Sequence, residues 1–390
     1  MNKRLLIYTI AFLLSGVAFG QPKIDEVMKS VESNSSVLKA ERERINAVAL
    51  TYKTDILPEN PEIEYSKVLQ SGTGESEILV KQSFLFPTAY FLKCGLSKQQ
   101  VSNLENEYSA KRQDILLEAK NVFLEIVYHN KQMKFFAERL EQVKEIKQAM
   151  ETSFKQGNVG RMDYNKAALE YQDLSNQYNA ILVERNNELQ RLAELNGGVA
   201  IDVSDQQYDQ QYQVTDFQTL KADFIANDPT IAQLNADVDI AKKSVAVQRS
   251  LTLPKLSVGY RNINPGSNSV NGVVVGMTIP LWENRNKVKA QKANMMYKTE
   301  VVNQYQVAYT SALQQTYNRV VQKQSAYMSL SDLLKSSNNN NLLFKAYKGG
   351  NISILDLFQE LDYYYKLNTK WLEQEKEYYQ ELAKLYKYKL

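Results

Sequence analysis

The chain is poor in the residues that interrupt or cross-link secondary structure. Its 390 residues include 15 glycines, 8 prolines, one cysteine and one histidine. Glycine and proline therefore reach only about half of their average usage, which favours long uninterrupted elements. The single Cys94 excludes an internal disulfide, and the single His129 excludes a histidine-rich metal site. We expect both to be ordinary residues on helix faces.

Strong charge of one sign is also missing. The chain has 47 basic and 44 acidic residues, well mixed, for a net charge of +3. This balance argues against a nucleic-acid-binding protein, which needs a basic face. The sequence also lacks a nucleophile–base pattern, a glycine-rich phosphate loop and a metal-ligand spacing. We therefore expect no enzyme activity, no cofactor and no metal site.

The N-terminus has the layout of a secretory signal peptide, predicted to span residues 1–20. A short basic region, Met1 to Arg4, precedes an apolar run from Leu5 to Leu14, and small residues follow up to Gly20. The apolar run is too short to cross a bilayer. No later segment contains about 20 uninterrupted apolar residues, so no transmembrane helix is expected. The mature protein is predicted to leave the cytoplasm.

The rest of the chain is predicted to be one structural unit that is duplicated. The stretch KQGNVGRMDYNKAALEYQ begins at Lys155, and the similar KGGNISILDLFQELDYYY begins at Lys348, 193 residues later (348 minus 155). The same offset relates other punctuating residues: Asn34 and Asn227, Pro61 and Pro254, Gly157 and Gly350, Asp163 and Asp356. A period this long excludes a solenoid, whose repeats have about 20 to 50 residues. We predict a first repeat at 21–198, a polar linker at 199–215 on the outside of the molecule, and a second repeat at 216–390.

Each repeat contains a pair of segments in which apolar and polar residues alternate, which predicts strands. In the first segment Ile63 and Tyr65 alternate with Glu62 and Glu64. Turn residues separate the two segments of each pair, so each pair should form a hairpin. The four strands are predicted at about 61–70, 76–87, 254–263 and 271–282.

Helical periodicity covers most of the remaining sequence. It runs from Ile24 to Leu57 and from Phe217 to Leu251, and very long helices are predicted to begin near Pro87 and near Trp282. Each could reach roughly 65 residues, on the order of 100 Å at 1.5 Å per residue. Gly157 and Gly350 should end these helices, after which the chain returns as another helix. The predicted fold class is mainly α with a small β part, built from a duplicated helix–β-hairpin–helix unit.

Four short strands cannot close a sheet alone, but their alternation suits strands with lipid on one side and a lumen on the other. Membranes admit only closed barrels, so several copies would have to share one. Two copies give eight strands, and side chains fill the interior of a barrel of that size. Three copies give twelve strands and leave room for a pore. A soluble periplasmic coiled-coil protein with two hairpins is the structural alternative. A general diffusion porin is disfavoured because porins have many strands and few helices.

The order and double occurrence of these motifs resemble the TolC-type outer-membrane channels. The resemblance covers essentially the whole mature chain and includes two strand segments that begin near Leu-Pro, the strand ends SFLFP and MTIPLW, and Leu195-Asn196-Gly197 after the first-repeat helix. It implies a homotrimer with a twelve-stranded barrel in the outer membrane and a helical α-barrel that crosses the periplasm. The implied partners are a periplasmic adaptor (membrane fusion protein) and an inner-membrane transporter, expected to be of the resistance–nodulation–division type. The implied function is passive export of small molecules or ions, with type I protein secretion as the alternative.

The resemblance also implies roles for residues at the tip of the helices. Asp356 and Gln359 match the positions of a ring that narrows the periplasmic entrance in the family, where both positions are acidic. Three copies of Asp356 around an axis would repel one another and attract cations. The simpler interpretation is a carboxylate that interacts with its own helix dipole. The implied adaptor-docking turns are Gly157, Asn158 and Val159, with Gly350, Asn351 and Ile352. Tyr363, Tyr364 and Tyr365 are expected to pack between helices.

Overall fold

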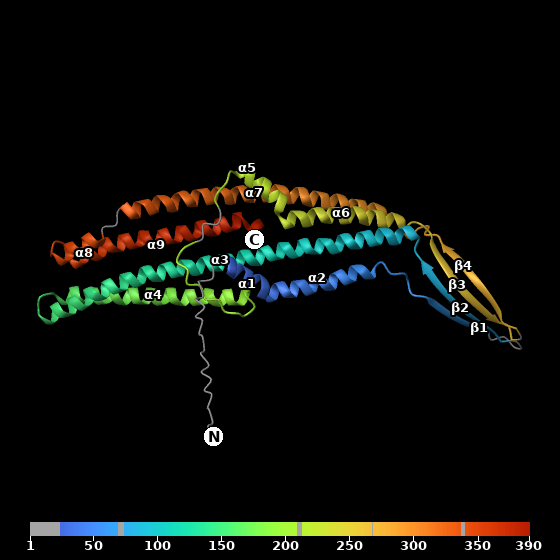
Figure 1. Ribbon diagram of the computed structural model, residues 1–390, viewed down its shortest axis with the longest axis horizontal. Helices are drawn as coiled ribbons and strands as arrows, with labels where there is room; N and C mark the ends of the chain where they lie inside the picture. The colour runs from blue at the N-terminus through green and yellow to red at the C-terminus, as the bar shows by residue number, and fades with distance from the viewer. Residues whose placement is uncertain (1–23, 69–73, 209–212, 267, 337–339) are drawn as a thin grey trace, which may run out of the picture.

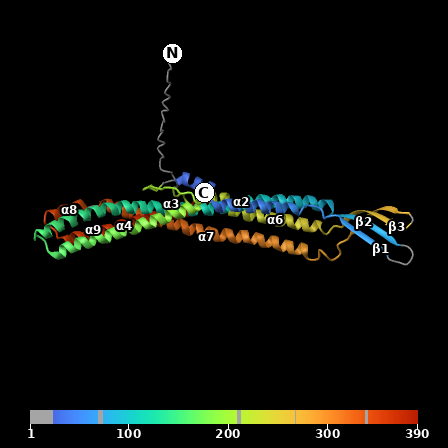
Figure 2. The same cartoon turned by 90° about the horizontal axis from the view of Figure 1, so that it is seen from below.

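The computed structural model describes residues 24–68, 74–208, 213–266, 268–336 and 340–390, so the predicted signal peptide lies outside the described residues. Long helices run side by side, with a small sheet at one end of the molecule and two helix hairpins at the other (Figure 1). Figure 2 shows that the bundle is also narrow when seen from below. None of the described helices has a stretch long and apolar enough to cross a membrane.

The two predicted repeats have closely similar orders of elements, but the second has two helices where the first has one long helix, and a final 3-10 helix. The first contains α1 (Ile24–Asn34), α2 (Ser36–Thr54), β1 (Glu62–Val68), β2 (Glu75–Phe84), α3 (Pro87–Lys155) and α4 (Arg161–Leu195). The second contains α5 (Phe217–Asn227), α6 (Pro229–Ser250), β3 (Lys255–Asn264), β4 (Val270–Thr278), α7 (Lys287–Ser336), α8 (Asn340–Lys348), α9 (Ile354–Leu385) and the 3-10 helix η1 (Lys387–Lys389).

Many equivalent boundaries of the two repeats lie 193 residues apart. The offset relates the first residues of α1 and α5 (24 and 217), of β1 and β3 (62 and 255), and of α4 and α9 (161 and 354). It also relates the last residues of α3 and α8 (155 and 348). The internal duplication read from the sequence is therefore a duplication of the fold.

The two long helices differ from each other. α3 starts with Pro87 at its first turn, where proline loses no hydrogen bond, and it runs for 69 residues. The expected start of α7 near Trp282 is wrong, because α7 begins at Lys287 and ends after 50 residues at Ser336. The intervening residues form turns in which Asn286 has a φ of +65°, a left-handed conformation that asparagine tolerates. The connection between β4 and α7 is thus longer than the equivalent connection between β2 and α3.

The helices form a single layer whose neighbours change along the molecule. Near the sheet the contacts run α2 to α3, α3 to α6 and α6 to α7. Near the tip they run α4 to α3, α3 to α9 and α9 to α7. One flank of the layer is therefore α2 followed by α4, and the other flank is α7.

The four strands form one antiparallel sheet in the order β1-β2-β3-β4. The register pairs Ile63 with Val80, Val80 with Tyr260, and Tyr260 with Val273, so these apolar residues lie on one face. The opposite face carries the ion pairs Lys81–Glu62 and Arg261–Glu77, each at 2.8 Å. β2 and β4 end at Phe84 and Thr278, three and four residues before their predicted ends.

Two hydrophobic cores hold the helices together. The larger lies mid-molecule around residues 115–127 of α3, and the smaller lies near the tip around Phe136, Leu174 and Leu357. The segment between the repeats is anchored to the helices, because Val203 and Tyr208 are buried in the larger core. The Asn130 side-chain amide also donates to the carbonyls of Val203 (3.0 Å) and Asp205 (2.9 Å).

Candidate functional site

The tip is made of two helix hairpins that end in the same turn. Gly157 and Gly350 have φ of +75° and +72°, a backbone conformation that glycine adopts at little cost. In each turn the glycine N–H donates three residues back, to Phe154 or Tyr347, at 3.0 Å. The following asparagine N–H donates five residues back at 2.9 Å. These two bonds satisfy the free carbonyls at the end of a helix.

The residues predicted to dock a partner divide into two groups in these turns. The glycines and asparagines are exposed: Gly157, Asn158, Gly350 and Asn351. Val159 and Ile352 are half-buried and pack against the core near the tip. The outer surface of each turn is therefore formed by small and polar residues, and the β-branched residue fixes the turn to the helices below it.

Asp356 lies in the first turn of α9 and is exposed, as is Gln359 one turn further on. Its carboxylate accepts hydrogen bonds from the Ser353 N–H (3.1 Å) and the Ser353 hydroxyl (2.7 Å). The Ser353 hydroxyl in turn accepts from the Asp356 N–H at 3.2 Å, which completes a capping box. The hydrogen bonds from Ser353 lower the pKa of Asp356 below its ordinary value.

The sequence signal for this cap, which the sequence analysis missed, is a serine three residues before an aspartate at a helix start. The equivalent residue in the first repeat is Asp163. The residue three positions before it is Gly160 and not a serine, and no side chain caps α4. The two tip aspartates therefore differ, since only Asp356 is held by a side-chain partner at the helix cap.

The three consecutive tyrosines do not all pack between helices as expected. Tyr365 is buried, but Tyr363 is 66% exposed. Tyr363 follows Asp356 by seven residues, two helical turns, and therefore lies on the same face of α9. Asp356, Gln359 and Tyr363 form an open polar and aromatic surface on α9 near the tip.

A link between the two hairpins was missed by the sequence interpretation. The Arg139 guanidinium of α3 pairs with Glu170 of α4 at 2.7 Å and lies 4.3 Å from the centre of the Tyr365 ring of α9. The Tyr365 hydroxyl donates to the side-chain carbonyl of Gln142 at 3.0 Å. Burial raises the pKa of Tyr365 to about 12, so this hydroxyl keeps its proton at physiological pH. The sequence signal that could have predicted this link is Arg139, an arginine within an apolar stripe of the helix.

The sheet is the second candidate surface. Its apolar face is open in the single chain: Ile63 is 74% exposed, and Val273 and Val275 are each 76% exposed. Leu281 and Trp282, just beyond the end of β4, are also exposed. A contiguous apolar patch of this kind marks contact with lipid or another protein. The edges of the sheet are β1 and β4, whose outward backbone groups are available for another strand.

In the parts of the chain that the structure describes, no three His, Cys, Asp or Glu side chains gather so that they could hold a metal ion. Cys94 and His129 both lie on α3, and the His129 ring is 3.2 Å from the Gln132 side-chain oxygen. The tip offers exposed carboxylates and turns, and the sheet offers one apolar and one charged face.

Known proteins resemble this chain in fold. No protein-family model matches it, and no curated protein matches it in sequence. The outer-membrane channel OprN matches with a TM-score of 0.76 over 94% of this chain and 90% of that chain, at 14% identity. A membrane protein from Pseudomonas aeruginosa gives 0.78 over 94% and 92%, also at 14% identity. The Campylobacter jejuni CmeC outer-membrane channel gives 0.74 over 100% and 93%, at 16% identity. The chain has the fold of the TolC-type outer-membrane channels.

Proposed function

We propose that three copies of this chain form an exit duct in the outer membrane that passively exports small molecules or ions. The observation that carries this proposal is the sheet, which has one apolar face, one charged face and two edges at the end of long helices. A bilayer admits strands only when every edge is closed, so the sheet needs further strands from identical copies. Three copies supply twelve strands, and the apolar face would then contact lipid while the ion pairs Lys81–Glu62 and Arg261–Glu77 face the lumen.

The helices would extend from the outer membrane into the periplasm as a tunnel. In this assembly Asp356 and Gln359 of three copies would surround the periplasmic entrance. The exposed turns Gly157–Asn158 and Gly350–Asn351 would meet a periplasmic adaptor, with Val159 and Ile352 fixing each turn from below. The adaptor would connect the duct to an inner-membrane transporter of the resistance–nodulation–division type. The fold shared with outer-membrane channels supports this arrangement.

Purification in detergent followed by planar-bilayer recording tests the proposal. We expect a trimer with a far-UV circular dichroism spectrum dominated by helix and with discrete single-channel conductance. A monomer that stays soluble without detergent and gives no conductance would contradict it.

A further inference from the structure

The charges of this chain are balanced overall but not along its length. Residues 85–104, 242–255 and 282–298 together contain eleven basic residues and a single acidic residue, Glu283. The whole chain has a net charge of +3, so the remaining residues carry a net charge of −7 (+3 minus +10). The first segment contains the start of α3, the second the end of α6 and the third the start of α7.

Contacts place these three segments together at the base of the sheet. The Gln248 side-chain amide of α6 donates to the Asn284 side-chain oxygen at 3.2 Å, and the Asn284 amide donates to the Leu251 carbonyl at 2.6 Å. These bonds join the end of α6 to the chain just before α7. A Cβ added at Gly95 of α3 would lie 4.0 Å from the Lys243 ammonium of α6. Figure 1 shows the same ends of α3, α6 and α7 beside the sheet.

The fold accounts for five of the eleven cations. Lys93, Lys242, Lys255 and Lys298 each have a carbonyl or carboxylate partner. Arg249 lies in the last turn of α6, where the helix dipole favours a cation. The other six are exposed and form no ion pair with any residue that the structure describes. We call these six the basic collar: Lys98, Lys243, Arg285, Lys287, Lys289 and Lys292.

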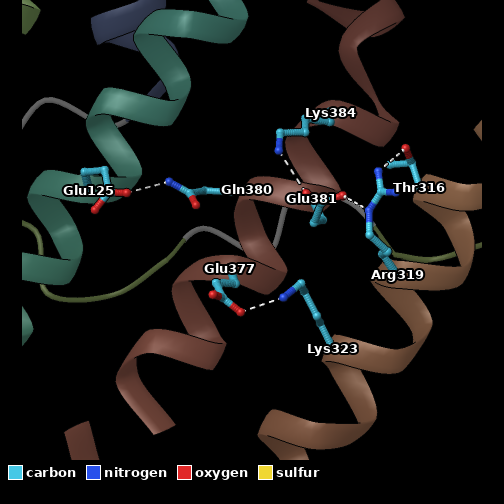
Figure 3. Close-up of polar contacts among 8 residues, drawn as sticks. All are labelled: Glu125, Thr316, Arg319, Lys323, Glu377, Gln380, Glu381 and Lys384. Atoms are coloured by element: carbon cyan, nitrogen blue, oxygen red, sulfur yellow. Dashed lines mark hydrogen bonds and ion pairs between the residues drawn. The ribbon is translucent and has the colours of Figure 1, made fainter. Parts of the chain in front are cut away.

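The basic collar differs from the cations further along α7. Figure 3 shows Arg319 and Lys323 of α7 joined to Glu381 and Glu377 of α9. At its start α7 has no acidic residue in the first turn, although the positive end of the helix dipole disfavours cations there. α3 also begins without an acidic residue or a side-chain cap. Anions from outside the chain would relieve the mutual repulsion of the collar.

The apolar face of the sheet indicates where a bilayer would end. Along β2 this face runs from Phe84 to Ile78, six residues (84 minus 78) or about 20 Å. Level with Ile78, the residues of β3 and β4 are already polar, namely Asn262 and Asn271. The apolar band of a membrane barrel is roughly 25 Å tall, and tilted strands give less height than their length. The sheet alone is therefore too short, and the missing height must lie at its helical end.

Exposed apolar side chains are present at that end. Leu281 and Trp282 are 74% and 78% exposed, and Phe91, one turn inside α3, is 80% exposed. Aromatic side chains of this kind are typical of the boundary between the apolar band and the headgroups. Lys98 follows Phe91 by seven residues, two helical turns, so it lies on the same face of α3, roughly 10 Å further from the sheet. The hydrocarbon would thus end near Phe91 and Trp282, with the basic collar just beyond it.

We propose that the basic collar binds the headgroups of anionic phospholipids in the periplasmic leaflet of the outer membrane. This proposal rests on the proposed insertion of the sheet and adds the class of lipid that surrounds its base. Lysine and arginine near a membrane surface attract anionic headgroups, and their aliphatic stems can lie along apolar neighbours while the charge stays among the headgroups. In three copies the collar would form a ring of positive charge that a shell of such lipids neutralises.

Trp282 allows the lipid beside the collar to be identified by fluorescence. The chain has two tryptophans, so Trp371→Phe leaves Trp282 as the reporter. This protein is reconstituted in phosphatidylcholine vesicles in which the same minor fraction of lipid is brominated phosphatidylglycerol or brominated phosphatidylcholine. Quenching of Trp282 gives the relative association constant of the two lipids. We expect phosphatidylglycerol to be favoured several-fold, and equal quenching by both lipids overturns the proposal.

A triple substitution tests whether the collar causes this preference. Lys98→Gln, Lys243→Gln and Lys289→Gln together remove one collar charge from each segment, and we expect the preference to fall several-fold. Far-UV circular dichroism checks that the variant is folded, and a folded variant that keeps the wild-type preference overturns the proposal. The control removes three exposed lysines near the tip by the same substitution and should keep the preference: Lys335, Lys345 and Lys348.

Salt and free phosphate keep the test decisive if the triple variant does not fold. Sodium chloride at about 1 M shortens the screening length to about 3 Å and should abolish the preference in the protein that carries only Trp371→Phe. A preference that persists there is not carried by charge and overturns the proposal. Inorganic phosphate at constant ionic strength should leave the preference intact, and its loss would mean that the collar binds free phosphate and not lipid. Absence of quenching by either brominated lipid would instead contradict insertion of the sheet, and with it the proposed function.

Discussion

The Asp356 carboxylate has two roles: it caps its own helix, and it is proposed to line the entrance of the duct. Replacing it in all three copies by alanine removes three negative charges from the axis. We expect Asp356→Ala to raise single-channel conductance and to weaken block by divalent cations several-fold in planar bilayers. Unchanged block would place the constriction elsewhere.

Ser353→Ala is the matched control, because it breaks the same capping box but keeps the charge. Loss of such a cap costs about 1 kcal/mol, yet divalent block should stay close to wild type.

The pH dependence of divalent block has a definite sign. The Ser353 hydrogen bonds lower the pKa of Asp356, so they favour its charged form as the pH falls. Block should weaken as falling pH protonates Asp356, and Ser353→Ala, which removes these hydrogen bonds, should move that loss to higher pH.

Glycine is required at some tip positions and not at others. Gly157 has a φ of +75°, so any side chain there is strained, even though an added Cβ would have no neighbour within 4 Å. Gly160, three residues later, has an ordinary φ of −72°. We expect Gly157→Ala to lower the unfolding free energy by roughly 1 kcal/mol and Gly160→Ala to leave it nearly unchanged. Thermal melts of the two variants compare them directly.

Among the elements, the first repeat was predicted better than the second, and the reason is chemical. α3 starts at a proline and contains no further proline, so its start and length could be predicted. For α7 we considered only proline and glycine as interruptions. The asparagines before Lys287 form turns, with Asn284 donating to the Leu251 carbonyl at 2.6 Å, and serine and asparagine also surround the end of α7. Serine and asparagine favour turns over helix because their side chains hydrogen-bond to backbone groups in non-helical conformations.

α9 is attached to its neighbours in different ways along its length. Its C-terminal half is held by ion pairs to α3 and α7, whereas near the tip Tyr365 supplies a single hydrogen bond to Gln142. Tyr365→Phe keeps the ring over Arg139 and removes that bond, which is worth about 1 kcal/mol.

Hydrogen exchange should separate the two halves of α9 in this variant. We expect amides near Ile354–Tyr365 to exchange roughly fivefold faster, as a loss of about 1 kcal/mol implies, while amides near Lys376–Leu385 stay protected. Equal acceleration in both halves would mean that α9 opens as one unit and that the tyrosine is not a local link.

Two neighbouring residues of the sheet are expected to respond in opposite ways to substitution by lysine. Val273 lies on the apolar face, and Val274 lies on the charged face beside Gly259. A lysine on the lipid face of a barrel costs about 2–4 kcal/mol near the middle of the bilayer, and less near its surfaces. We expect Val273→Lys to lower the amount of trimer in the outer-membrane fraction and Val274→Lys to be tolerated. If both are tolerated, the apolar face does not contact lipid.

For the whole molecule, the sequence was informative wherever a pattern recurred within one chain. Periodicity and the 193-residue offset predicted the order of helices and strands and the fold they build. They did not predict the Arg139–Tyr365 link or the burial of Val203, because both depend on segments that are distant in sequence. The tip residues Asp356 and Gln359 are exposed in the single chain, and their role depends on where further copies lie, so it stays a prediction.

The closure of the sheet is the step on which the whole assembly depends, and backbone amides can report it. In an antiparallel edge strand every second residue points its N–H away from its only neighbour. If β1 and β4 were free edges, those amides would exchange rapidly while the central strands β2 and β3 stayed protected. If β4 of one copy pairs with β1 of the next, all amides of both edge strands gain partners. We expect uniform protection across the four strands in the detergent-purified trimer, measured at single-residue resolution, and alternating fast exchange in β1 and β4 after dissociation to monomers. Alternating exchange in the intact trimer would mean that the copies associate through their helices without closing a barrel.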